Sequence, residues 1–315
     1  MTRAFVFPGQ GAQTIGMGKA LAEAYPAAQA VFDEVDDALG ERLSALIWDG
    51  DIETLTLTQN AQPALMATSL AAMRALEAEG VPVTAATYVA GHSLGEYSAL
   101  AAAGAISVAD TARLLRIRGK AMQDAVPVGQ GAMAALLGLD FKTVNDLAQR
   151  AAKATGAVCQ AANDNDPGQV VVSGATGAVQ HAIELAQEAG AKRAVMLPVS
   201  APFHCKLMAP AARVMAEALD DVDIENPSVR LVANVLAHDV SNPETIRSLL
   251  VEQVTHSVRW RESVQWMLDK GVTEFWEIGA GKALSGMIRR IDRSATCRTV
   301  GTPDDVAAAA ASLAG

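Results

Sequence analysis

The pentapeptide Gly91-His92-Ser93-Leu94-Gly95 constrains the fold of this chain more than any other segment. It follows an apolar, β-type run, Thr87-Tyr88-Val89-Ala90, and leads into an alanine-rich, helix-prone run at 96–103. A Gly-x-Ser-x-Gly segment between a strand and a helix is the pattern of a nucleophile elbow, whose turn is too tight for a Cβ atom at either glycine. The pattern therefore predicts that Ser93 projects its hydroxyl from this corner, beside the unpaired N–H groups of a helix N-terminus.

Strand and helix patterns alternate along most of the chain, which is typical of an α/β fold with a mainly parallel sheet. Half of the 315 residues are hydrophobic and only 4% are aromatic, which favours closely packed helices on a sheet. Between Val126 and Val199 the order becomes β-α-β-β-α-β, the split ferredoxin-like arrangement. We therefore expect a hydrolase-like large subdomain, 1–126 and 200–315, with an inserted ferredoxin-like small subdomain, 127–199.

The expected elements are given by their residue ranges. The strands are 4–7, 87–90, 132–139, 157–162, 169–173, 193–199, 230–235, 273–278 and a short one near Thr299. The helices are 18–24, 27–39, 63–79, 96–103, 107–125, 143–154, 178–189, 211–219, 244–254, 262–270, 283–291 and an alanine-rich terminal helix. The polar segment 163–168 is expected to be a hairpin turn, because it ends in Pro167-Gly168.

A serine nucleophile needs a base, and the chain has five histidines. His92 is next to Ser93 on the elbow, so its side chain points elsewhere. We favour His204, because it lies where the chain re-enters the large subdomain and such junctions border clefts. His256 is the second choice. No acidic residue stands out as the group that orients the histidine, and a backbone carbonyl can serve instead.

Arg118 is the one cation centred on the apolar face of the helix predicted at 107–125. A buried guanidinium is strongly destabilising unless it is paired. Its partner is either an internal carboxylate or the carboxylate of a substrate, held by two parallel hydrogen bonds. The residues alone leave these two alternatives open.

The net charge of −10 and the absence of a long basic run argue against nucleic acid or an anionic membrane as a partner. Cys159, Cys205 and Cys297 are widely spaced and odd in number. They fit neither a disulfide framework nor a metal site, so we expect no metal and a reducing, cytoplasmic location. No targeting segment or membrane span is recognised.

Four motifs occur in order along the whole chain. They are Phe7-Pro8-Gly9-Gln10-Gly11-Ala12-Gln13, Gly91-His92-Ser93-Leu94-Gly95-Glu96-Tyr97, Arg118-Gly119-Lys120-Ala121-Met122-Gln123 and Ala201-Pro202-Phe203-His204. Together they closely resemble the malonyl-CoA:acyl-carrier-protein transacylases of bacterial type II fatty-acid synthesis. One departure is that Asn163-Asp164-Asn165-Asp166 is more acidic than the corresponding loop of that family.

The resemblance implies a role for several residues. Ser93 carries the malonyl group as an ester in a ping-pong reaction, His204 is its base, and Arg118 holds the free malonyl carboxylate. The resemblance also implies further substrate-binding residues: the backbone N–H groups of Gln10 and Leu94 as the oxyanion hole, Gln253 near the site, and His92 as a second histidine close to the serine. A backbone carbonyl, not an acid, orients the base, and Phe203 fits the malonyl-selective form.

The resemblance implies that the substrates are malonyl-CoA and acyl carrier protein and that no cofactor is used. The enzyme is expected to be a monomer. The contacts to the carrier protein are expected to be basic: Lys192, Arg193, Arg289 and Arg290. Two alternatives remain open: a malonyl acyltransferase of a polyketide pathway, and a serine esterase or thioesterase that uses the same Ser93 and His204. A non-catalytic subunit that docks the carrier is disfavoured by the intact Ser93, His204 and Arg118.

Overall fold

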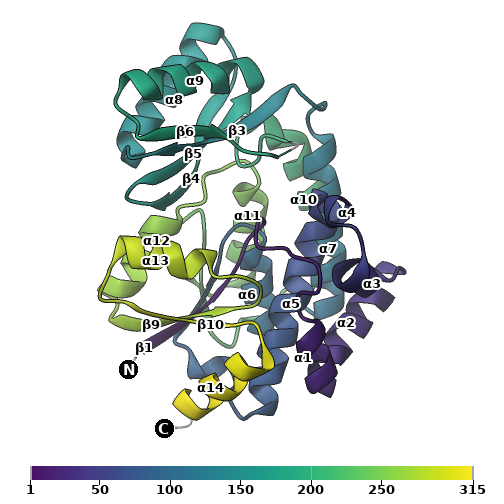
Figure 1. Cartoon of the computed structure of the whole chain (residues 1–315). Helices are drawn as coiled ribbons and strands as arrows, with labels where there is room; N and C mark the ends of the chain where they lie inside the picture. Colours follow the sequence, from purple (N-terminus) through teal and green to yellow (C-terminus); the bar gives the residue numbers. More distant parts are fainter. Residues whose placement is uncertain (1, 200, 314–315) are drawn as a thin grey trace.

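The computed structural model describes residues 2–199 and 201–313 as two β-sheets with helices packed on them (Figure 1). The remaining positions of the expected large subdomain, residues 1, 200, 314 and 315, lie outside the described residues. Both ends of the described chain lie at the lower end of the view in Figure 1, far from the smaller sheet.

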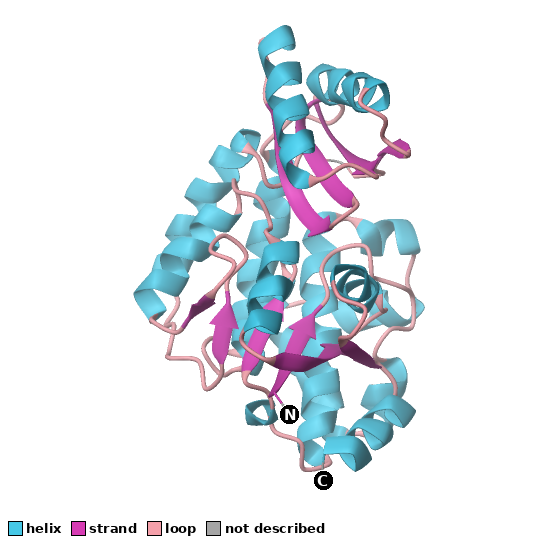
Figure 2. Cartoon of the chain, turned by 90° about the vertical axis from the view of Figure 1, so that its left-hand side faces the viewer, coloured by secondary structure: helices cyan, strands magenta, loops and turns pink. Residues whose placement is uncertain are grey.

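The larger sheet has six strands in the order β10-β9-β1-β2-β7-β8, all parallel except the β7–β8 pair. Its strands are β1 (Thr2–Phe7), β2 (Tyr88–Gly91), β7 (Arg230–Val232), β8 (Asp239–Val240), β9 (Val272–Ile278) and β10 (Thr296–Val300). Side chains of a strand alternate between the two faces, and β1 is buried on both: Phe5 and Phe7 join one core and Ala4 and Val6 the other. Such two-sided burial is expected of a parallel sheet covered by helices on both faces, which Figure 2 shows.

Most helices share the core that contains Phe5 and Phe7. They are α1 (Lys19–Ala24), α2 (Pro26–Leu39), α3 (Leu43–Asp49), α4 (Ile52–Thr56), α5 (Thr58–Ala78), α6 (Gly95–Ala102), α7 (Val108–Asp124), α10 (Ala209–Asp220), α11 (Pro243–Gln253) and α14 (Pro303–Leu313). The opposite face is covered by α12 (Trp260–Asp269) and α13 (Ala283–Ile291). Single 3-10 turns occur at Val83–Ala85 and Lys206–Met208. None of the helices in the described part of the chain combines the length and the apolarity that crossing a bilayer requires.

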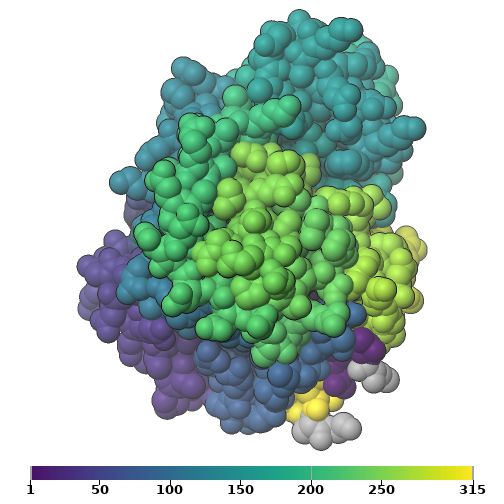
Figure 3. Space-filling view, turned by 180° about the vertical axis from the view of Figure 1, so that it is seen from behind, coloured from purple at the N-terminus to yellow at the C-terminus, as the bar shows by residue number. Residues whose placement is uncertain are grey.

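The smaller sheet is antiparallel, with the order β4-β5-β3-β6. Its strands are β3 (Gly131–Leu137), β4 (Cys159–Asp166), β5 (Gln169–Ala175) and β6 (Arg193–Met196), and its helices are α8 (Phe141–Thr155) and α9 (Thr176–Glu188). The chain order β3-α8-β4-β5-α9-β6 is the predicted ferredoxin-like arrangement, so both parts of the predicted fold class are confirmed. We call residues 131–196 the small unit. Figure 3 shows it from behind, as a teal projection above the green face formed by the chain after residue 200.

The prediction was wrong at the end of β4. The segment 163–168 was expected to be a turn, but the strand continues to Asp166 and only Pro167 and Gly168 form the turn. Asparagine and aspartate are poor strand formers. Tertiary contacts outweigh that preference here. The side chains from Asn163 to Asp166 are all buried, and Asp164 and Asp166 form ion pairs with residues of α12 and α13, which cover the larger sheet.

Smaller errors have local causes. Helix α5 begins at Thr58, so Pro63 lies inside the helix and not at its start. The strand predicted to reach residue 199 ends at Met196, before Pro198, and the strand predicted to reach residue 235 ends at Val232. The short helices α3 and α4 were not predicted, and most other boundaries differ by three residues or fewer.

Candidate active site

The elbow lies at the carboxyl end of two adjacent parallel strands. Phe7 at the end of β1 pairs with Gly91 at the end of β2, and the His92 N–H donates to the Phe7 carbonyl over 3.1 Å. A Cβ on Gly91 would lie 1.9 Å from the Gly95 carbonyl oxygen, and a Cβ on Gly95 would lie 2.2 Å from the Phe7 carbonyl oxygen. The predicted steric reason for the two glycines is therefore confirmed.

Ser93 and His204 both have a left-handed backbone, with φ of 54° and 57°. Residues with a Cβ rarely adopt this conformation, and it is common at active sites that the surrounding structure holds in place. Ser93 is fixed by Asn234, whose Oδ1 accepts from the Ser93 N–H over 2.8 Å while its Nδ2 donates to the Gly91 carbonyl over 2.7 Å. The Asn234 side chain thus bridges the two ends of the turn.

The structure brings His204 to Ser93. The two atoms Ser93 Oγ and His204 Nε2 are 2.8 Å apart, and His204 Nδ1 lies 2.9 Å from the Gln253 carbonyl oxygen. Because a carbonyl can only accept, Nδ1 carries the imidazole proton, and Nε2 is left to accept the serine proton. A main-chain carbonyl at the end of α11 therefore orients the imidazole.

Arg118 points from α7 toward the same serine and is only 1% exposed. Its Nη1 donates to Gln62 Oε1 over 2.7 Å, and its Nη2 donates to Gln253 Oε1 over 2.8 Å and to Ser93 Oγ over 3.1 Å. All these acceptors are neutral. Within residues 2–199 and 201–313, no carboxylate forms a salt bridge with Arg118, so a direct internal ion pair, one of the two predicted alternatives, is not observed.

Glu96, the second residue of α6, completes a buried network behind the serine. Its Oε2 accepts from Gln253 Nε2 over 2.7 Å and from the Asn234 backbone N–H over 3.2 Å. Gln253 Nε2 also donates to the Ser93 carbonyl over 3.0 Å. Gln253 therefore touches the nucleophile's backbone, the base and the guanidinium together.

Burial dominates the ionisation of these groups. Burial, followed by the nearby positive charge of Arg118, lowers the pKa of His204 to about 3, so its imidazole is neutral at physiological pH. Burial also lowers the pKa of His92. For Glu96, burial raises the pKa to about 7, although its hydrogen bonds and Arg118 oppose the rise. Burial lowers the pKa of Arg118, but a guanidinium remains protonated in proteins.

The Gln10 loop and the start of α6 face the serine. Gln10, Leu94 and Ser93 line one pocket, and in the described residues neither the Gln10 nor the Leu94 backbone N–H donates to a protein acceptor. The Ser93 N–H is occupied by Asn234 and cannot serve as an oxyanion donor. The predicted pair of donors is therefore compatible with this geometry.

His92 lies beneath the Gln10 loop. Its Nε2 is 2.8 Å from Asn165 Oδ1 at the end of β4, and its ring is 5.9 Å from the ring of Trp260. A Cβ on Gly9 would lie only 3.1 Å from His92 Nδ1, so the imidazole packs directly against the backbone of this loop. His92 thus lines the same pocket as Ser93, but its Nε2 contacts Asn165 and not the serine hydroxyl.

The catalytic pocket has a volume of about 430 Å³ and is lined by both parts of the molecule. Met133 and Asn163 come from the small unit, and Leu197 follows it directly. Met122 and Phe203 add further apolar wall beside Ser93, Arg118 and His204. Such a cavity, apolar with a few convergent polar groups, is typical of a small-molecule site.

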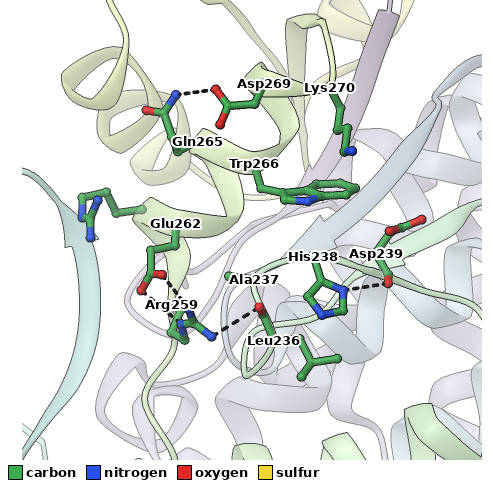
Figure 4. Close-up of a pocket in the computed structure, with 11 residues that line it drawn as sticks. Leu236, Ala237, His238, Asp239, Arg259, Glu262, Gln265, Trp266, Asp269 and Lys270 are labelled. Atoms are coloured by element: carbon green, nitrogen blue, oxygen red, sulfur yellow. Dashed lines mark hydrogen bonds and ion pairs between the residues drawn. The ribbon is translucent and has the colours of Figure 1, made fainter.

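A larger pocket, of about 590 Å³, lies beside β8 and α12 and shares no lining residue with the catalytic pocket (Figure 4). Most of its charged side chains already have partners: Arg259 pairs with Glu262 and donates to the Val235 and Leu236 carbonyls. Asp239 pairs with Arg230, and Arg261 pairs with Asp164. Lys270 lies over the Trp266 ring at 5.4 Å. It offers no arrangement of nucleophile and base, so we place the chemistry at Ser93.

Other predicted residues lie away from the serine. His256, the second choice for the base, is on the surface, where its Nδ1 contacts the Glu252 carbonyl. Lys192, Arg193, Arg289 and Arg290 are all exposed, and Arg290 pairs with Asp166 over 2.7 Å.

Gln62, Glu96, Asn165 and Asn234 carry no sequence signal that predicts a role in the site. Each contacts the site from a different element, so only the strand order and helix packing bring them together.

Comparisons of the sequence and of the structure with known proteins agree on the family of this chain. The family model described as "Acyl transferase domain" matches residues 4–309. The malonyl CoA-acyl carrier protein transacylase of Bacillus subtilis is 47% identical over 303 residues, which cover 96% of this chain and 94% of the relative.

Solved structures agree. An acyl-carrier-protein S-malonyltransferase from Bartonella henselae is 55% identical, with a TM-score of 0.97 and complete coverage of both chains. A malonyl-transacylase in complex with its type II PKS acyl-carrier protein is 40% identical, with a TM-score of 0.95, covering 99% of this chain and 100% of that one. The chain therefore belongs to the acyl transferase family, together with the malonyl CoA-acyl carrier protein transacylases.

Proposed function

We propose that this protein transfers a malonyl group from malonyl-CoA to the phosphopantetheine thiol of an acyl carrier protein, through a malonyl ester of Ser93. The observation that carries the proposal is the position of Ser93 Oγ. It lies 2.8 Å from a neutral imidazole nitrogen and 3.1 Å from a buried guanidinium. Nucleophile, base and a cation for the acyl carboxylate thus converge in one pocket.

In the first half of the reaction, Ser93 Oγ attacks the thioester carbonyl while His204 Nε2 takes the serine proton. The Gln10 and Leu94 N–H groups stabilise the oxyanion, each by about 3 kcal/mol. When the tetrahedral intermediate collapses, the carbon–sulfur bond breaks and the imidazolium returns its proton to the coenzyme A sulfur. The Gln253 carbonyl supports the imidazolium through Nδ1.

In the second half, the carrier thiol gives its proton to His204 and attacks the serine ester, and the proton returns to Ser93 Oγ. No step requires a metal or a cofactor.

Arg118 is proposed to select the malonyl group. Its Nε has no hydrogen-bond partner among the described residues, although it is buried, so the guanidinium retains donors for a carboxylate. Because this group lies so close to Ser93 Oγ, the acyl carboxylate must be separated from the reacting carbonyl by a short spacer, such as one methylene group. An acetyl group would leave the guanidinium without an anionic partner.

The carrier protein is proposed to dock on exposed basic side chains. These are Lys192, Arg193, Arg289 and Arg290. Their exposure and positive charge support this assignment. We also propose that the protein is a monomer.

We also infer that residues 1–126 and 200–315 act as one subdomain and residues 127–199 as the other. The separate apolar core of the small unit, formed by β3–β5 with α8 and α9, supports this division.

Two alternatives differ in the acceptor. The similarity to a malonyl-transacylase that is complexed with a type II PKS acyl-carrier protein favours a polyketide carrier as the second candidate. A serine esterase or thioesterase would instead let water resolve the acyl-serine.

The decisive experiment follows the mass of the intact protein. Incubation with malonyl-CoA and no carrier should give a stable malonyl adduct on Ser93, which disappears when a phosphopantetheinylated carrier is added and appears on the carrier thiol. Ser93→Ala should give no adduct. Release of free malonate without an adduct would support a hydrolase and contradict the proposal. Parallel reactions with a fatty-acid carrier and a polyketide carrier would distinguish the two transferase candidates by rate.

A further inference from the structure

Two side chains of opposite charge are buried behind the nucleophile. Arg118 and Glu96 are each 1% exposed. Arg118 lines the catalytic pocket, whereas Glu96 lies outside it at the start of α6. The proposed reaction gives Arg118 a task but leaves this carboxyl group without one.

The amide of Gln253 connects the two groups. Its Oε1 accepts from Arg118 Nη2 over 2.8 Å, and its Nε2 donates to Glu96 Oε2 over 2.7 Å. The two charges therefore act on each other through one polarised amide and are not in contact. When Glu96 is ionised, it is the anion that balances Arg118, because the imidazoles of His92 and His204 are neutral.

A malonyl group on Ser93 changes this balance. Its free carboxylate would add a second anion beside the single guanidinium, in surroundings where charges are poorly screened. Resting on the function proposed above, we propose that Glu96 is the proton-accepting counter-charge of the acyl site, which takes up a proton when a malonyl carboxylate occupies Arg118.

The ability of Glu96 to bind a proton near neutral pH supports this inference, because burial raises its pKa to about 7 before acylation. A second anion nearby raises the pKa of a carboxyl group further. Malonyl binding is then linked to proton uptake, so the apparent affinity for malonyl-CoA increases as the pH falls from above 8 toward 7. An acetyl group carries no charge and causes no uptake.

Few other charges act on this carboxyl group. The titratable groups that share its surroundings are Arg118 on α7, Tyr97 on α6 and His204 before α10. Burial raises the pKa of Tyr97 to about 12, so this phenol stays neutral.

The charged side chains on the neighbouring elements are paired elsewhere or exposed. On α7, Arg113 pairs with Asp110 and Arg116 with Glu41, whereas Lys120 and Asp124 are exposed. On α5, Arg74 pairs with Glu77; on β1, Arg3 pairs with Glu274; and on β7, Arg230 pairs with Asp239. The β7–β8 connection and α11 reach Glu96 through the neutral amides of Asn234 and Gln253. The charged side chains of α11 pair elsewhere, Arg247 with Glu244 and Glu252 with His256.

The chemical step itself takes no proton from solution. The serine hydroxyl loses one proton and the coenzyme A sulfur gains one, since a thiol with a pKa near 8.5 stays protonated at pH 7. Any net uptake during acylation therefore reports on another group.

The test measures this uptake directly. Wild-type protein in a weakly buffered solution at pH 7, with a pH indicator, is mixed with excess malonyl-CoA or acetyl-CoA, and the adduct on Ser93 is quantified by intact mass in the same sample. Uptake of about half a proton per malonyl adduct is expected, because a group at its pKa is half protonated. No uptake is expected per acetyl adduct, or per malonyl adduct of Glu96→Gln.

A malonyl adduct without proton uptake would overturn the role of Glu96 while leaving the proposed function intact. Equal uptake with acetyl-CoA or in Glu96→Gln would overturn it as well. Failure to form any malonyl adduct would instead refute the proposed function, and the inference with it. Should Glu96→Gln not fold, an infrared difference spectrum of the wild type decides: a new carboxylic-acid band must accompany malonylation and not acetylation, and its absence would refute the assignment.

Discussion

At the scale of single residues, the unusual feature is a guanidinium that is buried, charged and held only by neutral oxygens. Gln62 and Gln253 fix the orientation of Arg118 and leave its charge without a direct partner. Sequence periodicity places Arg118 on the buried face of its helix but cannot identify what it meets. The two glutamines lie 56 and 135 residues away in the chain, on helices whose packing no local pattern encodes.

Arg118→Ala should therefore change substrate selection more than it changes the chemical step. We expect kcat/KM for malonyl transfer to fall by at least about 30-fold, which corresponds to about 2 kcal/mol, because the acyl carboxylate would be buried without a partner. Acyl transfer from acetyl-CoA should change much less. Arg113→Ala, an exposed position of the same helix that pairs with Asp110, is the control. Equal losses for both substrates in Arg118→Ala would contradict the role of a carboxylate clamp.

At the scale of elements, the nucleophile depends on how three parallel strands end. Loops after β1, β2 and β7 meet at one edge of the larger sheet, and Asn234 from the last of them joins the two ends of the elbow. The elbow could be predicted because its glycine spacing is local. Asn234 could not, because its role depends on β7 being the neighbour of β2 in the sheet. In the chain, 138 residues lie between Gly91 and Arg230, and no local sequence pattern spans that separation.

Gly91→Ala should disable the elbow. The added Cβ would meet the Gly95 carbonyl oxygen at 1.9 Å, and this backbone atom cannot move without displacing Ser93. We expect the free energy of unfolding to fall by about 2–3 kcal/mol and the malonyl adduct to be lost, as measured by urea unfolding and intact mass.

Gly177→Ala in α9 is the matched control, because a Cβ there meets nothing within 4 Å. This substitution should leave acylation unchanged and stabilise the helix slightly. Wild-type acylation by Gly91→Ala would show that the turn tolerates a side chain.

At the scale of the whole molecule, the end of β4 joins the small unit to the helices of the larger sheet. Asp164 pairs with Arg261 on α12 over 2.8 Å and Asp166 with Arg290 on α13 over 2.7 Å. The Asp164 N–H also donates to the Val258 carbonyl over 2.9 Å. Read locally, the sequence Asn163-Asp164-Asn165-Asp166 resembles a solvated turn. Its burial depends on cations that come 97 and 124 residues later in the chain, so a local reading could not recover it.

Arg261→Ala should show how much this contact stabilises the molecule. The substitution leaves the Asp164 carboxylate, which is 0% exposed, without its ionic partner. We expect a loss of about 2–3 kcal/mol in the free energy of unfolding, at the low end for a buried pair because Arg261 itself is partly exposed. Urea unfolding at neutral pH measures the change. Arg230→Ala, which removes an exposed pair with Asp239, should cost less than about 1 kcal/mol, and a similar loss in both variants would argue against a structural role for the buried pair.

The contact between Asn165 and His92 has a practical consequence for engineering. The last residues of β4 belong to the inserted unit by chain order, yet they touch the side chain that supports the Gln10 loop. A chimera that exchanges the insert for that of another acyltransferase would therefore also replace part of the lining of the catalytic pocket. Such a graft should therefore retain Asn163–Asp166 of the recipient, and the breakpoints should fall inside the insert and not at its ends.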